Sequence, residues 1–213
     1  MLEFFIAALV IGIAPGPDNL FVLAQSATYG ARLGFCIILG LCTGIAIHTC
    51  LLVAGVSALI AASPTAFFVI QCLGAAYLLY LAYKSFQVRA GTVKLDESGD
   101  SRSGAGASDN AVPSARKLYL RGVIMNLTNP KVILFILSLI PPAVRLERPI
   151  HPSLQMAIFG AEFIVATMIV FGSIALLAGS VKKYLLNSPK ANRNLNWFSG
   201  CVFILLAIAL FVV

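Results

Sequence analysis

The sequence predicts an all-α integral membrane protein with six transmembrane helices. Of its 213 residues, 60% are apolar and 11% are charged, and the mean hydropathy is +0.95. A soluble domain carries about 25% charged residues, so water is not the main solvent of this chain. Six apolar runs approach or exceed the roughly 20 residues that a helix needs to cross the hydrocarbon of a bilayer.

The six predicted spans follow from these apolar runs. They cover residues 2–24, 34–60, 66–86, 118–142, 153–179 and 197–213. The first run lacks a basic N-terminal region and has no small-residue cleavage site before Pro15, so we expect a retained helix rather than a signal peptide.

A polar segment divides the predicted single membrane domain, residues 1–213, into two halves. Residues 88–117 are rich in Gly, Ser, Asp and Ala and cannot bury enough apolar surface to become ordered. We therefore expect a first repeat at 1–87, a solvated linker, and a second repeat at 118–213. Because each half has three spans, the second half enters the membrane from the opposite side, which makes the repeats inverted.

The loop charges predict the orientation of the chain. One face receives twelve basic residues: Arg32, Lys84, Arg89, Lys94, Arg102, Arg116, Lys117, Arg121, Lys182, Lys183, Lys190 and Arg193. The opposite face has only Arg145 and Arg148. The positive-inside rule makes the first face cytoplasmic, with the 88–117 linker, and places both termini outside. The net charge of +7 therefore reflects topology, and we expect no nucleic-acid partner.

The first and fourth spans are each interrupted near the middle by a polar, proline-containing string. The first string is Pro15, Gly16, Pro17, Asp18 and Asn19; the second includes Asn126, Asn129, Pro130 and Lys131. Proline lacks a backbone N–H and breaks the helical hydrogen-bond ladder, while glycine tolerates non-helical backbone. Irregular backbone at membrane depth is tolerated where protein or a water-filled cavity satisfies it. Paired breaks in inverted halves therefore indicate the substrate site of a transporter.

Three ionisable side chains are predicted near mid-membrane: Asp18, Lys131 and Glu162. An ion pair between Lys131 and either carboxylate would neutralise the charges inside the bundle. One interpretation is therefore that the pair only holds the two halves together. Alternatively, Lys131 and the helix start at Pro130 bind a substrate carboxylate. Asp18 or Glu162 would then face a substrate ammonium, or take up a coupling proton, because burial favours the neutral form of a carboxylate.

Further polar and small residues are candidates for the pocket or for helix packing. Gly40, Gly44 and His48 form a stripe on one helical face, where the glycines favour close packing and the histidine is either a packing group or a proton carrier. Asn129 is placed to cap the half-helix that starts at Pro130. Tyr77 lines the transport path or bonds between helices.

Other classes of site lack their sequence signatures. The five cysteines lie inside apolar runs without metal-ligand spacing, and no nucleotide-binding lysine loop, HExxH or GxSxG motif occurs. We therefore expect no enzyme, no cofactor and no metal site.

The chain resembles the lysine exporter (LysE) superfamily, and within it the RhtB type of homoserine and threonine exporters. The resemblance rests on the first-span string from Pro15 to Asn19, on Gly40, Gly44 and His48, on residues 74–78, on Arg121 and Gly122, on the string from Asn126 to Lys131, and on Phe135 and Pro141. It implies an exporter in the bacterial inner membrane, driven by the proton or another ion gradient and forming a homodimer. Ile45 departs from the pattern, because many relatives carry an aspartate there.

We therefore expect a secondary active exporter of amino acids or closely related small metabolites, with a midplane site between the two polar strings. One alternative is an exporter of metal or other cations that uses Asp18, Glu162 and His48 as ligands, although Lys131 would repel such cargo. Another is a non-transporting membrane assembly partner.

Overall fold

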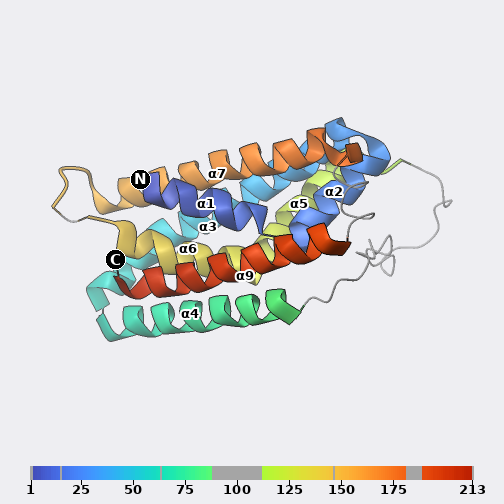
Figure 1. Cartoon of the computed structure of the whole chain (residues 1–213). Coiled ribbons are helices and arrows are strands. Elements are labelled where there is room, and N and C mark those ends of the chain that lie inside the picture. Colours follow the sequence, from blue (N-terminus) through green and yellow to red (C-terminus); the bar gives the residue numbers. More distant parts are fainter. Residues whose placement is uncertain are drawn as a thin grey trace.

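The described part of the chain consists of helices and their connections. The computed structural model describes residues 2–14, 16–62, 64–87, 112–145, 147–180 and 189–212. The helices are α1 (Leu2–Ile13), α2 (Pro17–Tyr29), α3 (Ala31–Ala62), α4 (Pro64–Gln87), α5 (Ala115–Thr128), α6 (Pro130–Ala143), α7 (Pro152–Leu176) and α9 (Pro189–Val212). The predicted all-α architecture is confirmed for these residues (Figure 1). The predicted linker falls mostly outside them.

Two predicted spans are broken where the sequence places its prolines. The helix pairs α1–α2 and α5–α6 bend by 62° and 56° at their breaks. Pro17 and Pro130 each occupy the first turn of the second half-helix, where the missing N–H costs no helical hydrogen bond. The breaks in the first and fourth predicted spans are therefore confirmed.

The apolar helices are those of a membrane protein. Ala31–Gly55 and Pro152–Leu176 are long and apolar enough to cross a bilayer, and each bent pair passes the same test when taken as one span. The described residues thus provide two to four candidate spans, with a shorter apolar segment at Asn196–Ile208. A total of six spans stays a prediction.

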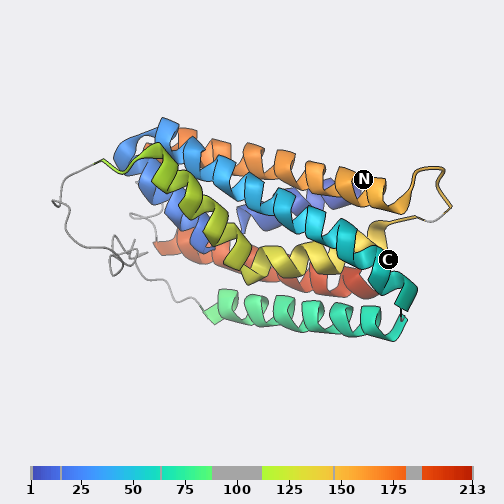
Figure 2. The same ribbon diagram turned by 180° about the vertical axis from the view of Figure 1, so that it is seen from behind.

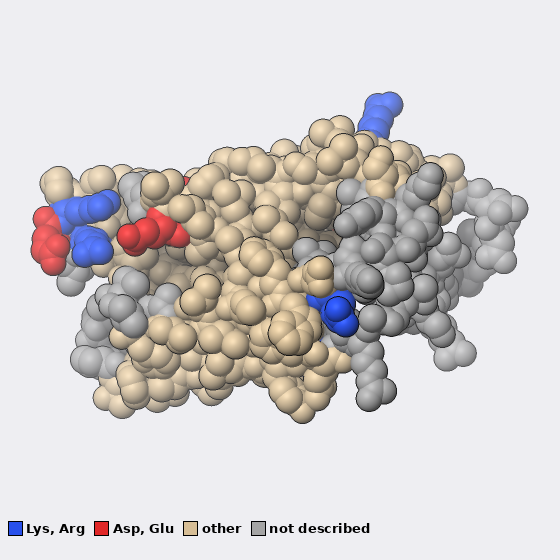
Figure 3. Space-filling model, in the orientation of Figure 1, with Lys and Arg blue, Asp and Glu red and all other residues tan. Residues whose placement is uncertain are grey.

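Both ends of the described chain lie at the same end of the bundle. Figures 1 and 2 show the two labelled termini beside the connection between α6 and α7, whereas the connection between α2 and α3 lies at the opposite end. On the face drawn in Figure 3, acidic and basic side chains lie at one end, further basic side chains lie right of centre and at the upper right, and a broad surface without charged side chains separates the two groups. Large apolar side chains such as Leu51, Ile124 and Leu205 are more than half exposed, as expected of a surface that faces lipid.

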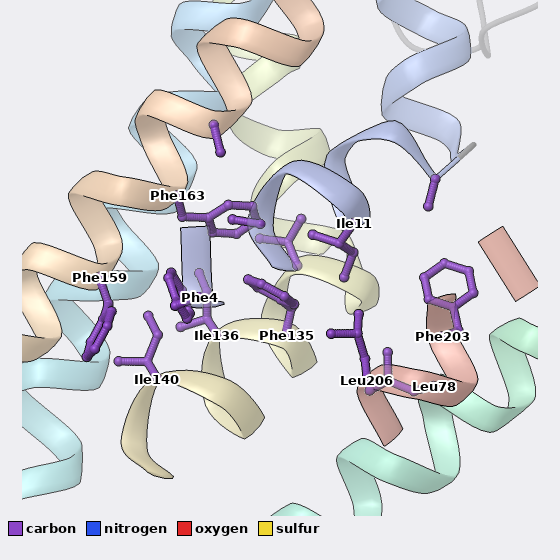
Figure 4. Packing of buried hydrophobic residues seen from close by; sticks show 14 of the residues in the cluster. Phe4, Ile11, Leu78, Phe135, Ile136, Ile140, Phe159, Phe163, Phe203 and Leu206 are labelled. Atoms are coloured by element: carbon purple, nitrogen blue, oxygen red, sulfur yellow. The ribbon is translucent and has the colours of Figure 1, made fainter. Parts of the chain in front are cut away.

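Aromatic packing joins α1 to α6 and α7. The ring centroid of Phe4 lies 5.6 Å from that of Phe135 and 4.9 Å from that of Phe159. Phe135 in turn lies 4.8 Å from Phe163 (Figure 4). Such pairs contribute about 0.5–1.5 kcal/mol each beyond their burial. The first half-helix is therefore held against the second half of the chain by side chains of three elements.

The backbones of α3 and α5 approach closely at two glycines. A Cβ atom on Gly40 would overlap the carbonyl oxygen of Tyr119 and lie 3.0 Å from the Cα of Gly122. A Cβ on Gly44 would lie 2.6 Å from the side chain of Asn126. Small residues promote helix association in membranes because they allow this approach. The stripe predicted from the sequence therefore faces α5 and supports packing.

We expect the substitution Gly40→Ala to destabilise the protein. The new methyl group meets backbone atoms that cannot move independently, so α3 and α5 must separate, at a cost of about 1–3 kcal/mol. The midpoint of thermal unfolding in detergent should fall by several degrees. Gly55→Ala in the same helix is the matched control, because its Cβ meets nothing within 4 Å. Equal midpoints for the two variants would contradict the close-packing interpretation.

Candidate functional site

Lys131 lies at the centre of the site, where the two breaks meet. Its side chain is only 8% exposed, and its Nζ donates hydrogen bonds to the carbonyl oxygens of Ile11 (3.2 Å) and Ala14 (3.0 Å). These carbonyls belong to the end of α1, where the helix has no further N–H groups to offer them and where the helix dipole is negative. A cation from the second break thus satisfies the backbone of the first break.

Asp18 and Asn129 connect the breaks in the other direction. Asn129 donates from its Nδ2 to Oδ2 of Asp18, which stands in the first turn of α2. The Oδ1 of Asn129 accepts a hydrogen bond from the backbone N–H of Lys131 at 3.0 Å and so caps α6, as the sequence predicts. One asparagine therefore serves both the start of α6 and the carboxylate of the other half.

Two further residues of the first string complete the contact between the breaks. Asn19 donates from its Nδ2 to the carbonyl oxygen of Gly12 at 2.7 Å, which satisfies another group at the end of α1. A Cβ atom on Gly16 would lie 3.2 Å from Nζ of Lys131, so the absence of a side chain at Gly16 leaves room for the ammonium. Pro15 lies outside the described residues.

The two opposite charges share one site without pairing directly. Asp18 is bonded to an amide and Lys131 to two carbonyls, and among the described side chains no ion pair joins them. Both side chains nevertheless line the same cavity, so each charge lies near an opposite one. A buried charge requires such compensation, because an isolated one costs several kcal/mol even after relaxation.

A small cavity lies between the breaks, with a volume of about 20 Å³. Its lining consists of Ile11, Gly12, Asp18, Leu41, Ile45, Asn126, Lys131, Val132, Phe163, Thr167 and Phe171. The volume suffices for about one water molecule. The cavity thus combines two charged groups and two neutral polar side chains with an otherwise apolar wall.

Two side chains of this lining each contain a buried oxygen atom that has no hydrogen-bond partner among the described residues. These atoms are Oδ1 of Asp18 and Oδ1 of Asn126, in side chains that are 3% and 2% exposed. A buried acceptor without a partner costs about 1–3 kcal/mol. The Asn126 oxygen lies against α3, because a Cβ atom on Gly44 would be 2.6 Å from it.

The other predicted site residues surround this centre at different distances. His48 interacts with the backbone of Asn126, and its Nε2 has no partner. Glu162 precedes Phe163 in α7 but is absent from the cavity lining among the described residues, and its Oε2 is also unpartnered. Tyr77 lies in α4 beside Tyr80, with ring centroids 5.9 Å apart, and does not border the cavity.

Most of the apolar wall was not anticipated from the sequence. Phe163, Thr167 and Phe171 are spaced four residues apart on one face of α7, and Leu41 and Ile45 have the same spacing on α3. The spacing identifies a shared helical face. It does not indicate which of several apolar faces borders the cavity, so only contact with the broken helices identifies these residues.

Comparison with known proteins adds an independent observation. The chain matches the LysE type translocator family over residues 9–213. It is 30% identical over 202 residues to an uncharacterized membrane protein of Vibrio cholerae, with 95% of this chain and 91% of the relative covered. No solved structure matches the chain.

Two similar proteins carry names that state a transported solute. The homoserine/homoserine lactone efflux protein of Salmonella typhimurium is 29% identical over 202 residues, covering 95% of this chain and 91% of the relative. The leucine efflux protein of the same organism is 29% identical over 201 residues, covering 94% and 89%. The similarity therefore extends over nearly the whole of each protein.

Substitutions of Asn129 should separate its two roles in stability. Asn129→Ala removes the cap of α6, worth about 1 kcal/mol, and the hydrogen bond to the Asp18 carboxylate, worth about 1.5–3 kcal/mol. Asn129→Ser retains a capping oxygen alone. We expect unfolding midpoints in detergent to fall in the order wild type, Asn129→Ser, Asn129→Ala.

The exposed Asn194 of α9 provides a matched control for this series. Its replacement by alanine should leave the midpoint within error of the wild type. An Asn129→Ala protein that unfolds at the wild-type temperature would show that the contact between the breaks does not stabilise the bundle.

Proposed function

The chain belongs to the LysE type translocator family, and from this premise we propose that it is a secondary active exporter of amino acids or closely related small metabolites. The names of the homoserine/homoserine lactone and leucine efflux relatives support this solute class. The observation that carries the proposal is the cavity at which both broken helices present a charged side chain.

The energetic cost of this arrangement favours a role in transport over a role in packing. A charged side chain in the middle of a membrane helix costs at least about 2.5–3.5 kcal/mol, and this bundle contains two of them at one cavity. Two continuous apolar helices would join the halves without that cost. Broken helices that line a midplane cavity are typical of secondary transporters, where the charges contact the solute or the coupling ion.

The helix contacts support the proposed inverted repeat. In this proposal α1–α2 corresponds to α5–α6, α3 to α7, and α4 to α9. The contact between α3 and α5 then has its counterpart in the contact between α7 and α1, and the pairs α3–α7 and α4–α9 each join equivalent helices. This arrangement includes six membrane crossings with both breaks at the same depth.

The small volume of the cavity implies a conformational change during transport. About 20 Å³ holds one water molecule, whereas even a small amino acid has several more non-hydrogen atoms. The site must therefore widen to accept a solute, and the bends at the two breaks are the positions where short non-helical segments allow this. Alternating opening to the two sides follows from rocking one repeat against the other.

Coupling to the proton gradient belongs to the same proposal. Asp18 is the carboxylate that lines the cavity, and one of its oxygens is free to bind a proton when the solute leaves. Glu162, with an unpartnered oxygen in α7, is the second candidate for the coupling proton.

We further propose an inner-membrane location with both termini outside, following the loop charges, and a homodimer, following the family resemblance.

The cation-exporter alternative is weaker at this site. A metal ion in the cavity would lie beside Lys131, and two like charges at close range repel strongly inside a protein. An amino acid carries both charges and is compatible with a site that contains one carboxylate and one ammonium.

The exchange of amino acids in proteoliposomes tests the proposed function. Vesicles that contain the purified protein and unlabelled leucine, homoserine or threonine should accumulate the corresponding labelled amino acid by exchange. Asp18→Asn and Lys131→Ala should reduce this exchange at least about 100-fold, because each leaves one buried charge without its counterpart.

Glu147→Gln, in the exposed connection before α7, is the control and should exchange at the wild-type rate. An inward pH gradient should also change the steady-state level of the solute in wild-type vesicles. Normal exchange by folded Asp18→Asn protein would exclude the midplane site. If even the wild-type protein exchanges none of these amino acids, the proposed solute class is excluded.

A further inference from the structure

We propose that Thr167 contacts the transported solute, and that its hydroxyl group, together with the amide of Asn126, donates hydrogen bonds to an oxygen atom of the solute's carboxyl group. This inference rests on the proposed function and adds to it a specificity-determining residue on α7. Thr167 belongs to neither of the two polar strings that mark the breaks.

The hydroxyl group of Thr167 differs from others in the bundle because no described residue bonds to it. Thr43, Thr49, Thr128 and Ser173 each donate to the carbonyl oxygen four residues earlier in their helix, at 2.7–2.9 Å. Such a bond satisfies a hydroxyl group inside a helix without any tertiary partner. Thr167 lies within α7, yet its hydroxyl group forms neither this bond nor one to another described residue. A hydrogen-bonding group therefore stays available inside the bundle.

The side chain of Thr167 lies on the face of α7 that borders the cavity. It is 4% exposed, and it lines the cavity with Phe163 and Phe171, which lie one turn away on either side. Unlike Oδ1 of Asp18 and Oδ1 of Asn126, its hydroxyl oxygen is not one of the fully enclosed atoms without a partner. Because the residue is otherwise buried, the surface that this oxygen retains faces the cavity.

Asn126 presents a second group without a partner to the same cavity. Its side chain is 2% exposed and lines the cavity, and its Oδ1 is enclosed against Gly44. Its Nδ2 is not enclosed in this way and donates to no described residue. An amide nitrogen only donates, whereas a hydroxyl group donates and accepts. The two available groups are therefore complementary to an acceptor.

The carboxyl group is the part of an amino acid that supplies this acceptor. An ammonium group has only donors, and in leucine the carboxyl oxygens are the only acceptors. Lys131 adds positive charge to the same lining, with two of its three N–H bonds engaged by backbone carbonyls. Asp18 adds negative charge, but one of its oxygens is enclosed and the other is bonded to Asn129. The groups that remain for the solute are thus donors.

Paired substitutions of Thr167 test this inference in the full-length protein. Thr167→Val replaces the hydroxyl group by a methyl group of similar size, whereas Thr167→Ser keeps the hydroxyl group. Thr49→Val is the matched control, because buried Thr49 bonds within α3 and does not line the cavity. Exchange is measured in proteoliposomes with the labelled amino acid that the wild type exchanges fastest among leucine, homoserine and threonine.

We expect the KM for exchange to rise about tenfold or more in Thr167→Val, as expected for the loss of a hydrogen bond to a charged group. Thr167→Ser should stay within about threefold of the wild type, and Thr49→Val should match it. A wild-type KM in Thr167→Val, or an equal rise in the valine and serine variants, would overturn the inference while leaving the exporter function intact. If the wild type exchanges none of the three amino acids, the proposed function itself fails.

A solute analogue identifies the group that Thr167 contacts. The analogue is the primary amine that remains when hydrogen replaces the carboxyl group, which for leucine is isopentylamine. Removing both partners of one interaction should cost no more than removing one of them. We therefore expect the amine to inhibit exchange equally in the wild type and in Thr167→Val. Inhibition by the amine that weakens in Thr167→Val as much as inhibition by the amino acid would overturn the assignment to the carboxyl group.

Thermal unfolding in detergent separates contact with the solute from helix packing. A buried hydroxyl group without a partner opposes folding, so Thr167→Val should unfold without solute at the wild-type temperature or above it. A saturating amino acid should then stabilise the wild type more than Thr167→Val, because ligand binding stabilises in proportion to affinity. A lower midpoint of Thr167→Val without solute, combined with wild-type stabilisation by the amino acid, would assign Thr167 to packing and overturn the inference.

Discussion

The contact between the ammonium of Lys131 and the end of α1 is the interaction on which the arrangement of the site depends. A helix that stops inside a bundle leaves carbonyl groups without donors, and lipid offers none. Here the donors come from the other half of the chain, through Lys131, and from the next half-helix, through Asn19. In return, Asn129 binds the carboxylate of Asp18. Each break is stable because the other is present, so neither half forms the site alone.

This reciprocity explains how polar groups persist in a chain that is otherwise so apolar. Outside the cavity, the described helices are joined by aromatic packing around Phe135 and by the close backbone approach of α3 and α5. Those contacts set the distances between helices, and the approach of α3 to α5 also includes a hydrogen bond between the hydroxyl groups of Thr43 and Tyr119 at 3.0 Å. The hydrogen bonds of the breaks then hold Lys131, Asn129 and Asp18 together beside the cavity that both halves of the chain line.

The sequence predicts the positions of both breaks and one packing face. It does not predict which side chains line the cavity, and the reason is physical. Proline in an apolar run and charged residues beside it locate both breaks, and the spacing of Gly40 and Gly44 identifies a packing face. Sequence does not reveal the rotation of one helix about its axis relative to another. For that reason it does not reveal that the ammonium of Lys131 donates to the backbone carbonyls of the first break, and it leaves Phe163, Thr167 and Phe171 unidentified. The role of Lys131 toward a solute stays a prediction. Glu162 lies one residue from Phe163, yet that residue step of about 100° separates it from the lining.

The glycine contact of α3 with α5 also determines which parts of the bundle are able to move. Because the backbones of α3 and α5 meet at Gly40 and Gly44, α5 is packed tightly against α3 as far as Asn126, close to its end at Thr128. Asn126 lies on α5, which packs against α3, whereas Lys131 lies on α6, beyond the non-helical residue Asn129. Any change of angle at this single non-helical residue alters the spacing between Asn126 and Lys131. Because both residues belong to the lining, a change of angle at Asn129 would alter the cavity directly.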